Sequence, residues 1–220
     1  MKLLLTSSGI SNTSIQDALV DLLGKPIAES SALCIPTGVQ PFPGGPAHVY
    51  QFISGTNFSP MCGLGWKSLG VLELTALPSL DQERWAPMVR EVDVLLVDGG
   101  DAAYLCHWMR ASGLADLLPS LPETVWVGVS AGSMVMTPRI GAYFVEWRSA
   151  PDDQTLGTVD FSIFPHVENP DLPENTMAAA ERWAAGLSRR AYAIDDETAF
   201  KVVDGTVEVV SEGHWKLLTP

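Results

Sequence analysis

Positive charge is scarce in this sequence. Its 220 residues include 13 Lys and Arg against 26 Asp and Glu, which gives a formal net charge of −13. A protein with this charge repels phosphate backbones and anionic membrane surfaces, and no cluster of Lys or Arg offers a local exception. We therefore expect no nucleic acid and no membrane among its partners.

Cysteine and long apolar runs are scarce as well. Cys34, Cys62 and Cys106 are odd in number, far apart and free of any Cys-x-x-Cys pairing. This pattern argues against a disulfide framework or a zinc site and favours buried thiols in a reducing compartment. The apolar run at the N-terminus ends at Thr6, and no stretch approaches the roughly 20 apolar residues that span a bilayer. The sequence thus indicates a cytoplasmic protein, and it implies no metal and no cofactor.

The composition is that of a folded chain, with 46% apolar and 18% charged residues, and we expect one domain over residues 1–220. Short apolar runs alternate with segments of helical periodicity. This favours an α/β fold with a three-layer, doubly wound, mostly parallel sheet of the flavodoxin-like type. The expected strands cover residues 3–6, 32–35, 70–74, 92–97, 125–129, 159–164, 191–194, 199–203 and 206–210. The expected helices cover residues 14–23, 81–89, 102–109, 114–118 and 174–187.

Two connections carry further information. Residues 39–46 are dense in Pro and Gly, so we expect a surface loop there that borders a cleft at the strand ends. Asp204-Gly205 separates the last two expected strands and predicts a hairpin turn.

The strongest chemical signal is the segment Gly128-Val129-Ser130-Ala131-Gly132, at the end of the expected strand 125–129. A strand that ends in Gly-x-Ser-x-Gly and passes at once into a helix forces the Ser into a tight, strained turn that projects its hydroxyl out of the sheet. The same turn places the backbone N–H of Ala131 at a helix N-terminus, where it can stabilise an oxyanion. Ser130 is therefore the candidate nucleophile of a serine hydrolase.

A second half of an oxyanion hole is suggested by Gly99-Gly100, which follows the expected strand 92–97. Adjacent glycines let the backbone approach a ligand closely and turn an N–H toward it. The alternative is a plain turn between a strand and a helix.

A nucleophilic serine needs a base, and four histidines compete for that role. His48 lies in the Pro/Gly-rich region, His107 within a helix and His214 near the C-terminus, positions that are typical of surface or packing residues. His166 directly follows an apolar strand, and Pro165 restricts the backbone before it, which suits a base at the carboxyl edge of a sheet. We take His166 as the candidate base.

The base should be oriented by a carboxylate that fixes its tautomer. The acidic triplet Asp195-Asp196-Glu197 follows the short strand 191–194. We prefer Asp196, although spacing alone does not choose among the three. Other acids near expected strand ends or loops are Asp98, Asp101, Glu146, Asp152 and Asp153.

Taken together, these residues resemble the serine peptidase family that contains peptidase E (the aspartyl dipeptidases) and cyanophycinase, a branch of the class I glutamine amidotransferase-like fold. The matching pieces lie in the family's order and cover nearly the whole chain: residues 3–7, 97–101, 128–133, 164–166 and 193–199.

The resemblance implies that Ser130 is the nucleophile and His166 its base, with Gly100 and Ala131 donating backbone N–H groups to the oxyanion. The third member of the family's triad is an acid at the position of Asp196. Some aspartyl dipeptidases also depend on an acid after the nucleophile helix, and Glu146 is the nearest one here.

Two departures from the family pattern concern specificity. The usual Gly-Gly-Asn is Gly99-Gly100-Asp101, closer to the cyanophycinase form, so an acid stands where a neutral amide is expected near the substrate. Aspartyl dipeptidases also carry an Arg on the helix after the catalytic His, where this chain has Ala180 or Glu181. Arg182 is adjacent but should point about 100° away on a helix. A strict preference for an N-terminal Asp is therefore in doubt.

The expected function is serine-dependent hydrolysis of small peptides through an acyl-enzyme, as in a dipeptidase or other exopeptidase of the peptidase E type. One alternative is a cyanophycinase-like or other specialised amidase, favoured by Asp101 and the missing Arg. Another is a non-catalytic protein on the same fold that binds a small molecule or peptide. Glutamine amidotransfer is disfavoured because it uses Cys at the elbow. The expected partner is a small peptide, and a homodimer is left open.

Overall fold

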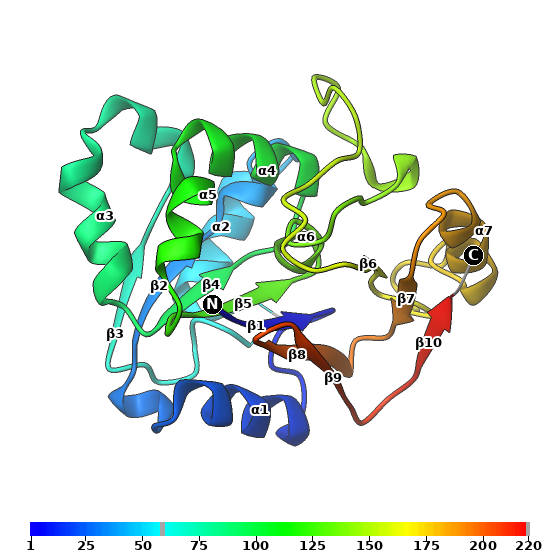
Figure 1. The fold of residues 1–220 in the computed structure, drawn as a ribbon, viewed down its shortest axis with the longest axis horizontal. Helices are drawn as coiled ribbons and strands as arrows, with labels where there is room; N and C mark the ends of the chain where they lie inside the picture. The colour runs from blue at the N-terminus through cyan, green and yellow to red at the C-terminus, as the bar shows by residue number, and fades with distance from the viewer. Residues whose placement is uncertain (58–59, 219–220) are drawn as a thin grey trace.

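The computed structural model describes residues 1–57 and 60–218, and its centre is a seven-stranded sheet in the order β3-β2-β4-β5-β1-β8-β9 (Figure 1). The first five strands in this order run parallel, and β8 and β9 run antiparallel to their neighbours. The α/β fold class with a mostly parallel sheet is confirmed. The strands are β1 (Lys2–Thr6), β2 (Ser31–Ile35), β3 (Ser68–Val71), β4 (Val94–Val97), β5 (Val125–Val129), β8 (Thr198–Val203) and β9 (Thr206–Ser211).

Helices cover both faces of this sheet and give it three layers. Alternate residues of each central strand serve opposite faces: Leu95 packs with the helices on one side, and Leu96 with those on the other. The first side carries α3 (Gln82–Glu91), α4 (Ala102–Ala111) and α5 (Leu114–Leu117), and the second carries α1 (Thr13–Leu23) and α2 (Gly45–Ser54). The short helix α6 (Ala131–Met134) follows β5 directly.

Helix α1 illustrates how local sequence sets these elements. The Asn12 side chain accepts a hydrogen bond from the Ile15 N–H and caps the start of the helix, and Gly24 ends it in the left-handed conformation with φ of 67°. Because Ile15, Leu19 and Leu22 recur at helical spacing, they form one buried face against the sheet.

A smaller sheet beside the first was not predicted. It has the order β10-β7-β6, with β6 (Ser162–Phe164) parallel to β7 (Ala191–Ile194) and β10 (Trp215–Leu218) antiparallel to it. Helix α7 (Met177–Ala185) packs on it through Trp183 and Ala180. The strand at 191–194 was predicted, but an apolar pattern of three or four residues does not reveal which sheet a strand joins.

Several expected boundaries change in the structure. The third strand ends at Val71 rather than residue 74, because residues 74–79 form a 3₁₀ helix whose Leu74 N–H donates to Thr37 Oγ1. Helix α2 begins inside the Pro/Gly-rich segment: Gly44 takes φ of 82°, and Pro46 lies in the first helical turn, where a missing N–H costs no hydrogen bond. The predicted hairpin turn at Asp204-Gly205 is confirmed between β8 and β9, with both residues at positive φ. Among the described residues, no helix has the length and apolar character needed to cross a membrane.

The junction between β5 and α6 is a close backbone contact near the strand ends. A Cβ at Gly128 would collide with the carbonyl oxygen of Gly132. A Cβ at Gly132 would in turn collide with the carbonyl oxygen of Val97 in the neighbouring strand β4. The two glycines flanking Ser130 therefore let the helix fold back onto the sheet.

We predict that Gly128→Ala lowers the free energy of unfolding by about 1–3 kcal/mol, because the backbone of the turn must shift. The matched control is Gly186→Ala at the end of α7, where φ is −79° and the nearest atom to a new Cβ is 3.4 Å away. That variant should stay within about 0.5 kcal/mol of the parent. Urea unfolding of both variants makes the comparison, and equal stabilities would contradict the close approach at Gly128.

Candidate active site

Strand register brings the candidate residues to one edge of the protein. In the large sheet Thr6 pairs with Val129, and Val97 pairs with Gly128, so the chain leaves β1, β4 and β5 at the same edge. Strand β8 runs antiparallel, with Ala199 opposite Thr6, so the residues just before β8 also lie at this edge. In the small sheet Phe164 pairs with Ala193, which places the segments after β6 and β7 side by side. Ligand sites of doubly wound sheets form at such an edge.

Ser130 has the strained backbone that the motif predicts. Its φ of 50° and ψ of −112° lie outside the regions that L-residues favour. The Ser130 N–H donates to the carbonyl oxygens of Thr6 (3.1 Å) and Ser7 (3.0 Å), and its own carbonyl accepts from Ser133 and Met134 in α6. These bonds hold the turn while its side chain stays partly exposed.

Two backbone N–H groups near Ser130 are free to bind an oxyanion. In the described residues, neither Gly100 N–H nor Ala131 N–H has a backbone acceptor. Gly100 has φ of 111°, which glycine adopts without strain, and its Cα lies against the backbone of Gly38. The Gly99 N–H is already used, because it donates to Asp98 Oδ1 at 2.8 Å. Of the predicted glycine pair, Gly100 lines the cavity with Ser130 and keeps its N–H without a backbone acceptor in the described residues, whereas Gly99 supports the turn.

His166 and Asp196 form a short hydrogen-bonded pair. His166 Nδ1 lies 2.5 Å from Asp196 Oδ1, which leaves Nε2 for a substrate or nucleophile. His166 itself has φ of 57°, so the candidate base, like the candidate nucleophile, sits on a strained backbone. Asn169 Nδ2 donates to the second carboxylate oxygen of Asp196 at 2.5 Å.

Ser7, which the sequence analysis did not single out, joins this pair to the nucleophile turn. Its hydroxyl donates to Asp196 Oδ1 at 2.9 Å and accepts from the His166 N–H at 2.8 Å. Its carbonyl oxygen accepts from the Ser130 N–H. A Ser after the first strand has no distinctive sequence signal, so only the register of β1 between β5 and β8 reveals this role.

The structure also separates Asp196 from the other acids considered for the triad. Asp195 is bound within its own turn, where it accepts from the Glu197 N–H and the Thr198 hydroxyl. Glu197 and Glu146 are exposed, and neither has a hydrogen bond to His166 in the described part of the chain. Asp196 is the acid of the triplet that contacts His166.

Asp101 has a different environment from the one expected. Its side chain is buried and caps α4, with Oδ1 accepting from the Tyr104 N–H and Oδ2 from the Trp147 N–H, each at 2.7 Å. Both oxygens are occupied by backbone donors, and Asp101 does not line the cavity next to Ser130. The interpretation of Asp101 as a substrate contact is therefore replaced by a capping role.

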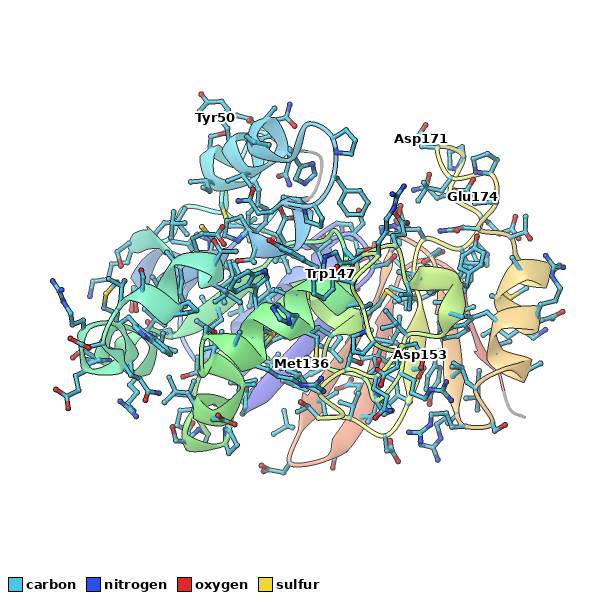
Figure 2. All side chains as sticks on the ribbon, turned by 90° about the horizontal axis from the view of Figure 1, so that it is seen from above. Tyr50, Met136, Trp147, Asp153, Asp171 and Glu174 are labelled. Carbon is cyan, nitrogen blue, oxygen red and sulfur yellow. The ribbon has the colours of Figure 1, made fainter. Side chains whose placement is uncertain are left out.

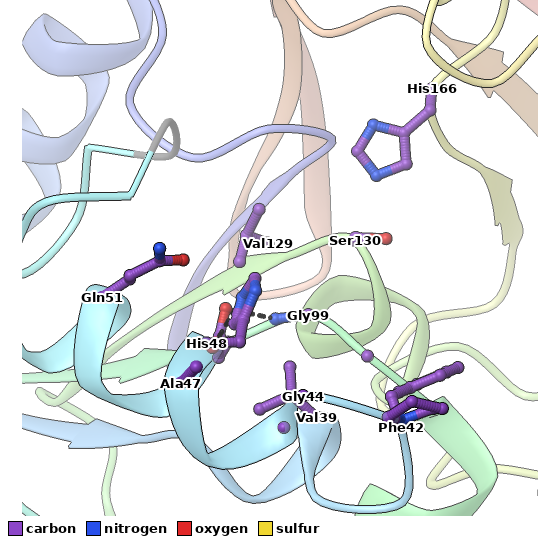
Figure 3. Close-up of a pocket in the computed structure, with 14 residues that line it drawn as sticks. Val39, Phe42, Gly44, Ala47, His48, Gln51, Gly99, Val129, Ser130 and His166 are labelled. Carbon is purple, nitrogen blue, oxygen red and sulfur yellow. Dashed lines mark hydrogen bonds and ion pairs between the residues drawn. The ribbon is translucent and has the colours of Figure 1, made fainter.

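A cavity of about 450 Å³ opens beside Ser130 and His166 (Figure 3). The Pro/Gly-rich segment borders the cavity as expected, with Val39, Phe42 and residues 43–45 in the wall, but helices take up both of its ends. Figure 3 shows the His166 ring and the Ser130 hydroxyl at the same end of the cavity, away from His48 and Gln51. No hydrogen bond joins these two side chains in the described structure, which is common when no substrate is present.

Figure 2 places Tyr50 of α2 and Asp171 and Glu174, which follow His166 in the chain, on one side of the molecule.

His48, which we expected to be a surface or packing residue, forms a second His–Asp pair with Asp98 in the same cavity. His48 Nε2 lies 3.4 Å from Asp98 Oδ2; the side chains are 36% and 3% exposed, respectively. The adjacent carboxylate of Asp98 raises the pKa of His48, while burial raises the pKa of Asp98. Helix α2 was not predicted, so nothing in the sequence pattern showed that His48 faces the strand ends.

The other candidate groups lie outside this cavity. His107 is exposed on α4, and His214 is 96% exposed beside Asp195. Arg182 lines a separate cavity with Arg139 and Asp153, in agreement with its expected direction away from the site. Within the described ranges, no group of three His, Cys, Asp or Glu side chains is arranged to hold a metal ion.

The match to known families now decides the assignment. Residues 3–210 match the model of peptidase family S51. The chain belongs to peptidase family S51. This confirms the resemblance described above, the class I glutamine amidotransferase-like fold and the expectation of a serine peptidase. No curated protein matches the sequence significantly.

Two solved structures share the fold of this S51 member. A Listeria monocytogenes EGD-e protein assigned as a candidate peptidase E is 20% identical, with a TM-score of 0.67, covering 96% of this chain and 98% of its own. A peptidase from an acI-B1 Actinobacterium is 19% identical, with a TM-score of 0.70, covering 99% of this chain and 90% of its own. At this identity the likeness shows the fold alone.

The environment of Asp196 predicts a pH dependence of stability. Burial raises the pKa of Asp196, but hydrogen bonds from His166, Ser7 and Asn169 outweigh it, so the pKa lies below its ordinary value. The unfolded value is about 3.9. The carboxylate therefore stabilises the folded protein above about pH 4, and this contribution is lost as the pH falls through the folded pKa.

We predict that Asp196→Asn lowers stability at pH 6 and shows a smaller further loss between pH 6 and pH 3 than the parent. Urea unfolding at both pH values measures the difference. Asp171→Asn, at an exposed acid in the segment after His166, should keep the parent's pH dependence. A parent-like pH dependence in Asp196→Asn would show that Asp196 does not carry this charge interaction.

Proposed function

We propose that this S51 member hydrolyses small peptides by acyl transfer, with Ser130 as nucleophile, His166 as general base and acid, and Asp196 as the orienting carboxylate. The observation that carries this proposal is that Ser130, on its strained turn, and His166, which is paired with Asp196, line one cavity. A hydroxyl, an imidazole and a partly buried carboxylate are the three groups of a catalytic triad.

The first half of the reaction forms the acyl-enzyme. The Ser130 hydroxyl attacks the carbonyl carbon of the peptide bond, and its proton passes to His166 Nε2. The carbonyl oxygen becomes negative and accepts hydrogen bonds from the Gly100 and Ala131 N–H groups. When the C–N bond breaks, His166 returns the proton to the leaving amine, and an ester to Ser130 remains.

The second half releases the acyl group. His166 takes a proton from water, which attacks the ester carbonyl, and the proton then returns to the Ser130 oxygen as the C–O bond breaks. Asp196 holds the His166 Nδ1–H throughout, which fixes the tautomer with Nε2 toward the serine and stabilises the imidazolium. No proton needs to move to Asp196.

The size of the cavity supports small substrates. Its volume of about 450 Å³ suits one or two amino-acid residues, and α2 and loop 39–45 bound the end away from His166. The cyanophycinase-like alternative was favoured by Asp101, whose carboxylate caps α4 instead. The non-catalytic alternative drew on the uncertain acid, and Asp196 now has a defined contact with His166.

We predict that a fluorophosphonate probe labels the parent protein at Ser130 and that Ser130→Ala abolishes the labelling. Ser130→Ala and His166→Ala should each lower kcat/KM on a dipeptide substrate library by at least about 10³-fold. His107→Ala, which changes an exposed histidine outside the cavity, should stay within about twofold of the parent. A folded parent protein that is neither labelled nor active on any dipeptide would favour the non-catalytic alternative.

A further inference from the structure

The cavity has two ends that face different parts of a bound substrate. In the proposed reaction, His166 must reach the leaving amine, so the leaving group lies at the end of the cavity next to His166. The acyl part of the substrate then extends from Ser130 toward the opposite end. That end is formed by Ala47, His48 and Gln51 of α2 and by Asp98 after β4. Figure 3 shows His48 and Gln51 on the opposite side of Ser130 from His166.

The charges at this end do not favour a negative substrate group. None of the described residues that line the cavity is Lys or Arg. Apart from His166, the one group there that can become positive is His48, and its Nε2 lies beside the buried carboxylate of Asp98. The formal charge of the whole chain, −13, adds a further unfavourable field for anions.

The His48–Asp98 pair supplies no net positive charge while Asp98 is ionised. With His48 protonated the pair is neutral, and with His48 neutral it carries one negative charge. A net positive pair requires a protonated Asp98 beside a charged His48. Burial raises the pKa of Asp98, but the His48 cation acts against its protonation. Asp98 Oδ2 is fully buried and has no hydrogen bond among the described residues, so its charge is balanced by His48 alone.

The remaining wall of the cavity is mainly apolar. Val39, Phe42, Ala47 and Val129 contribute side chains to it. Moving a carboxylate from water into such surroundings is costly unless a cation pairs with it. A neutral amide or an aliphatic chain avoids this cost, and an amide oxygen can still accept a hydrogen bond from His48 or Gln51.

We propose that the α2 end of the cavity holds the acyl part of the substrate and selects an uncharged side chain there over a carboxylate, with the His48–Asp98 pair as the specificity-determining element. This inference rests on the proposed peptidase function. The expected substrates are peptides in which the residue on the acyl side of the cleaved bond has an amide or an aliphatic side chain.

The test compares substrates that differ only in this charge. Dipeptides with N-terminal Asn and Asp, and with N-terminal Gln and Glu, are close isosteres, and their α-amino groups are the same. We expect kcat/KM for the amide member of each pair to exceed that for the acid by at least about tenfold, because the acid must lose its hydration in a cavity without Lys or Arg and beside the buried carboxylate of Asp98. Equal values, or a preference for Asp or Glu, would overturn the proposal.

Two variants should move this ratio in opposite directions. Asp98→Asn removes the negative charge while keeping the side-chain shape, so the amide-to-acid ratio should fall by about tenfold. His48→Gln removes the cation and leaves Asp98 charged, so the ratio should rise. Asp93→Asn is the matched control, because Asp93 lies just before β4, at the opposite end of that strand from Asp98, and is bound to Lys25 and Ser31. Asp93→Asn changes the net charge by the same amount as Asp98→Asn and should leave the amide-to-acid ratio within about twofold of the parent's.

The outcome separates this inference from the proposed function. Ser130 labelling by the fluorophosphonate probe reports the nucleophile in the parent and in each variant, whatever its substrate preference. Normal labelling together with an Asp or Glu preference would refute the pocket assignment and leave the peptidase mechanism standing. If Asp98→Asn does not fold, the opposite shift predicted for His48→Gln still decides the question, since an unchanged ratio there contradicts the proposal.

Discussion

Ser7 is the point at which the two halves of the candidate active site are held together. Its carbonyl oxygen accepts from the Ser130 N–H, while its hydroxyl contacts both His166 and Asp196. The nucleophile turn belongs to the large sheet, and His166 follows a strand of the small one. A single buried residue at the end of β1 therefore sets the position of the base relative to the nucleophile. The register of β1 between β5 and β8 fixes this arrangement.

Backbone strain occurs at both the candidate nucleophile and the candidate base. Ser130 and His166 both have positive φ, although neither is glycine. Such conformations cost of order 1–3 kcal/mol each and persist when surrounding bonds over-determine them. The hydrogen bonds of the Ser130 N–H and carbonyl groups hold the backbone of Ser130 in this conformation. Hydrogen bonds to the hydroxyl of Ser7 and the carboxylate of Asp196 hold His166. These hydrogen bonds orient the groups of the site before a substrate binds, as electrostatic stabilisation of an oxyanion requires.

The sequence predicted the parts of the site that have strong local signals. A buried strand followed by Gly-x-Ser-x-Gly defines Ser130, and an apolar strand followed by Pro165 defines His166. The choice among Asp195, Asp196 and Glu197 needed the structure, because three consecutive acids in a turn differ only in direction. The hydrogen bonds of Asp101 also needed the structure, because a carboxylate that caps a helix and one that contacts substrate look the same in sequence. Ser7, His48 and the small sheet depend on long-range pairing and on helix α2, which no short pattern revealed.

The proposed mechanism depends most directly on the geometry around Ser130 once a substrate-like group is attached. A crystal structure of the protein after reaction with a fluorophosphonate measures this. We expect the phosphorus bonded to Ser130 Oγ, one phosphonyl oxygen within hydrogen-bond distance of the Gly100 and Ala131 N–H groups, and His166 Nε2 facing the serine oxygen. An adduct on another residue, or a phosphonyl oxygen turned away from both N–H groups, would contradict the account.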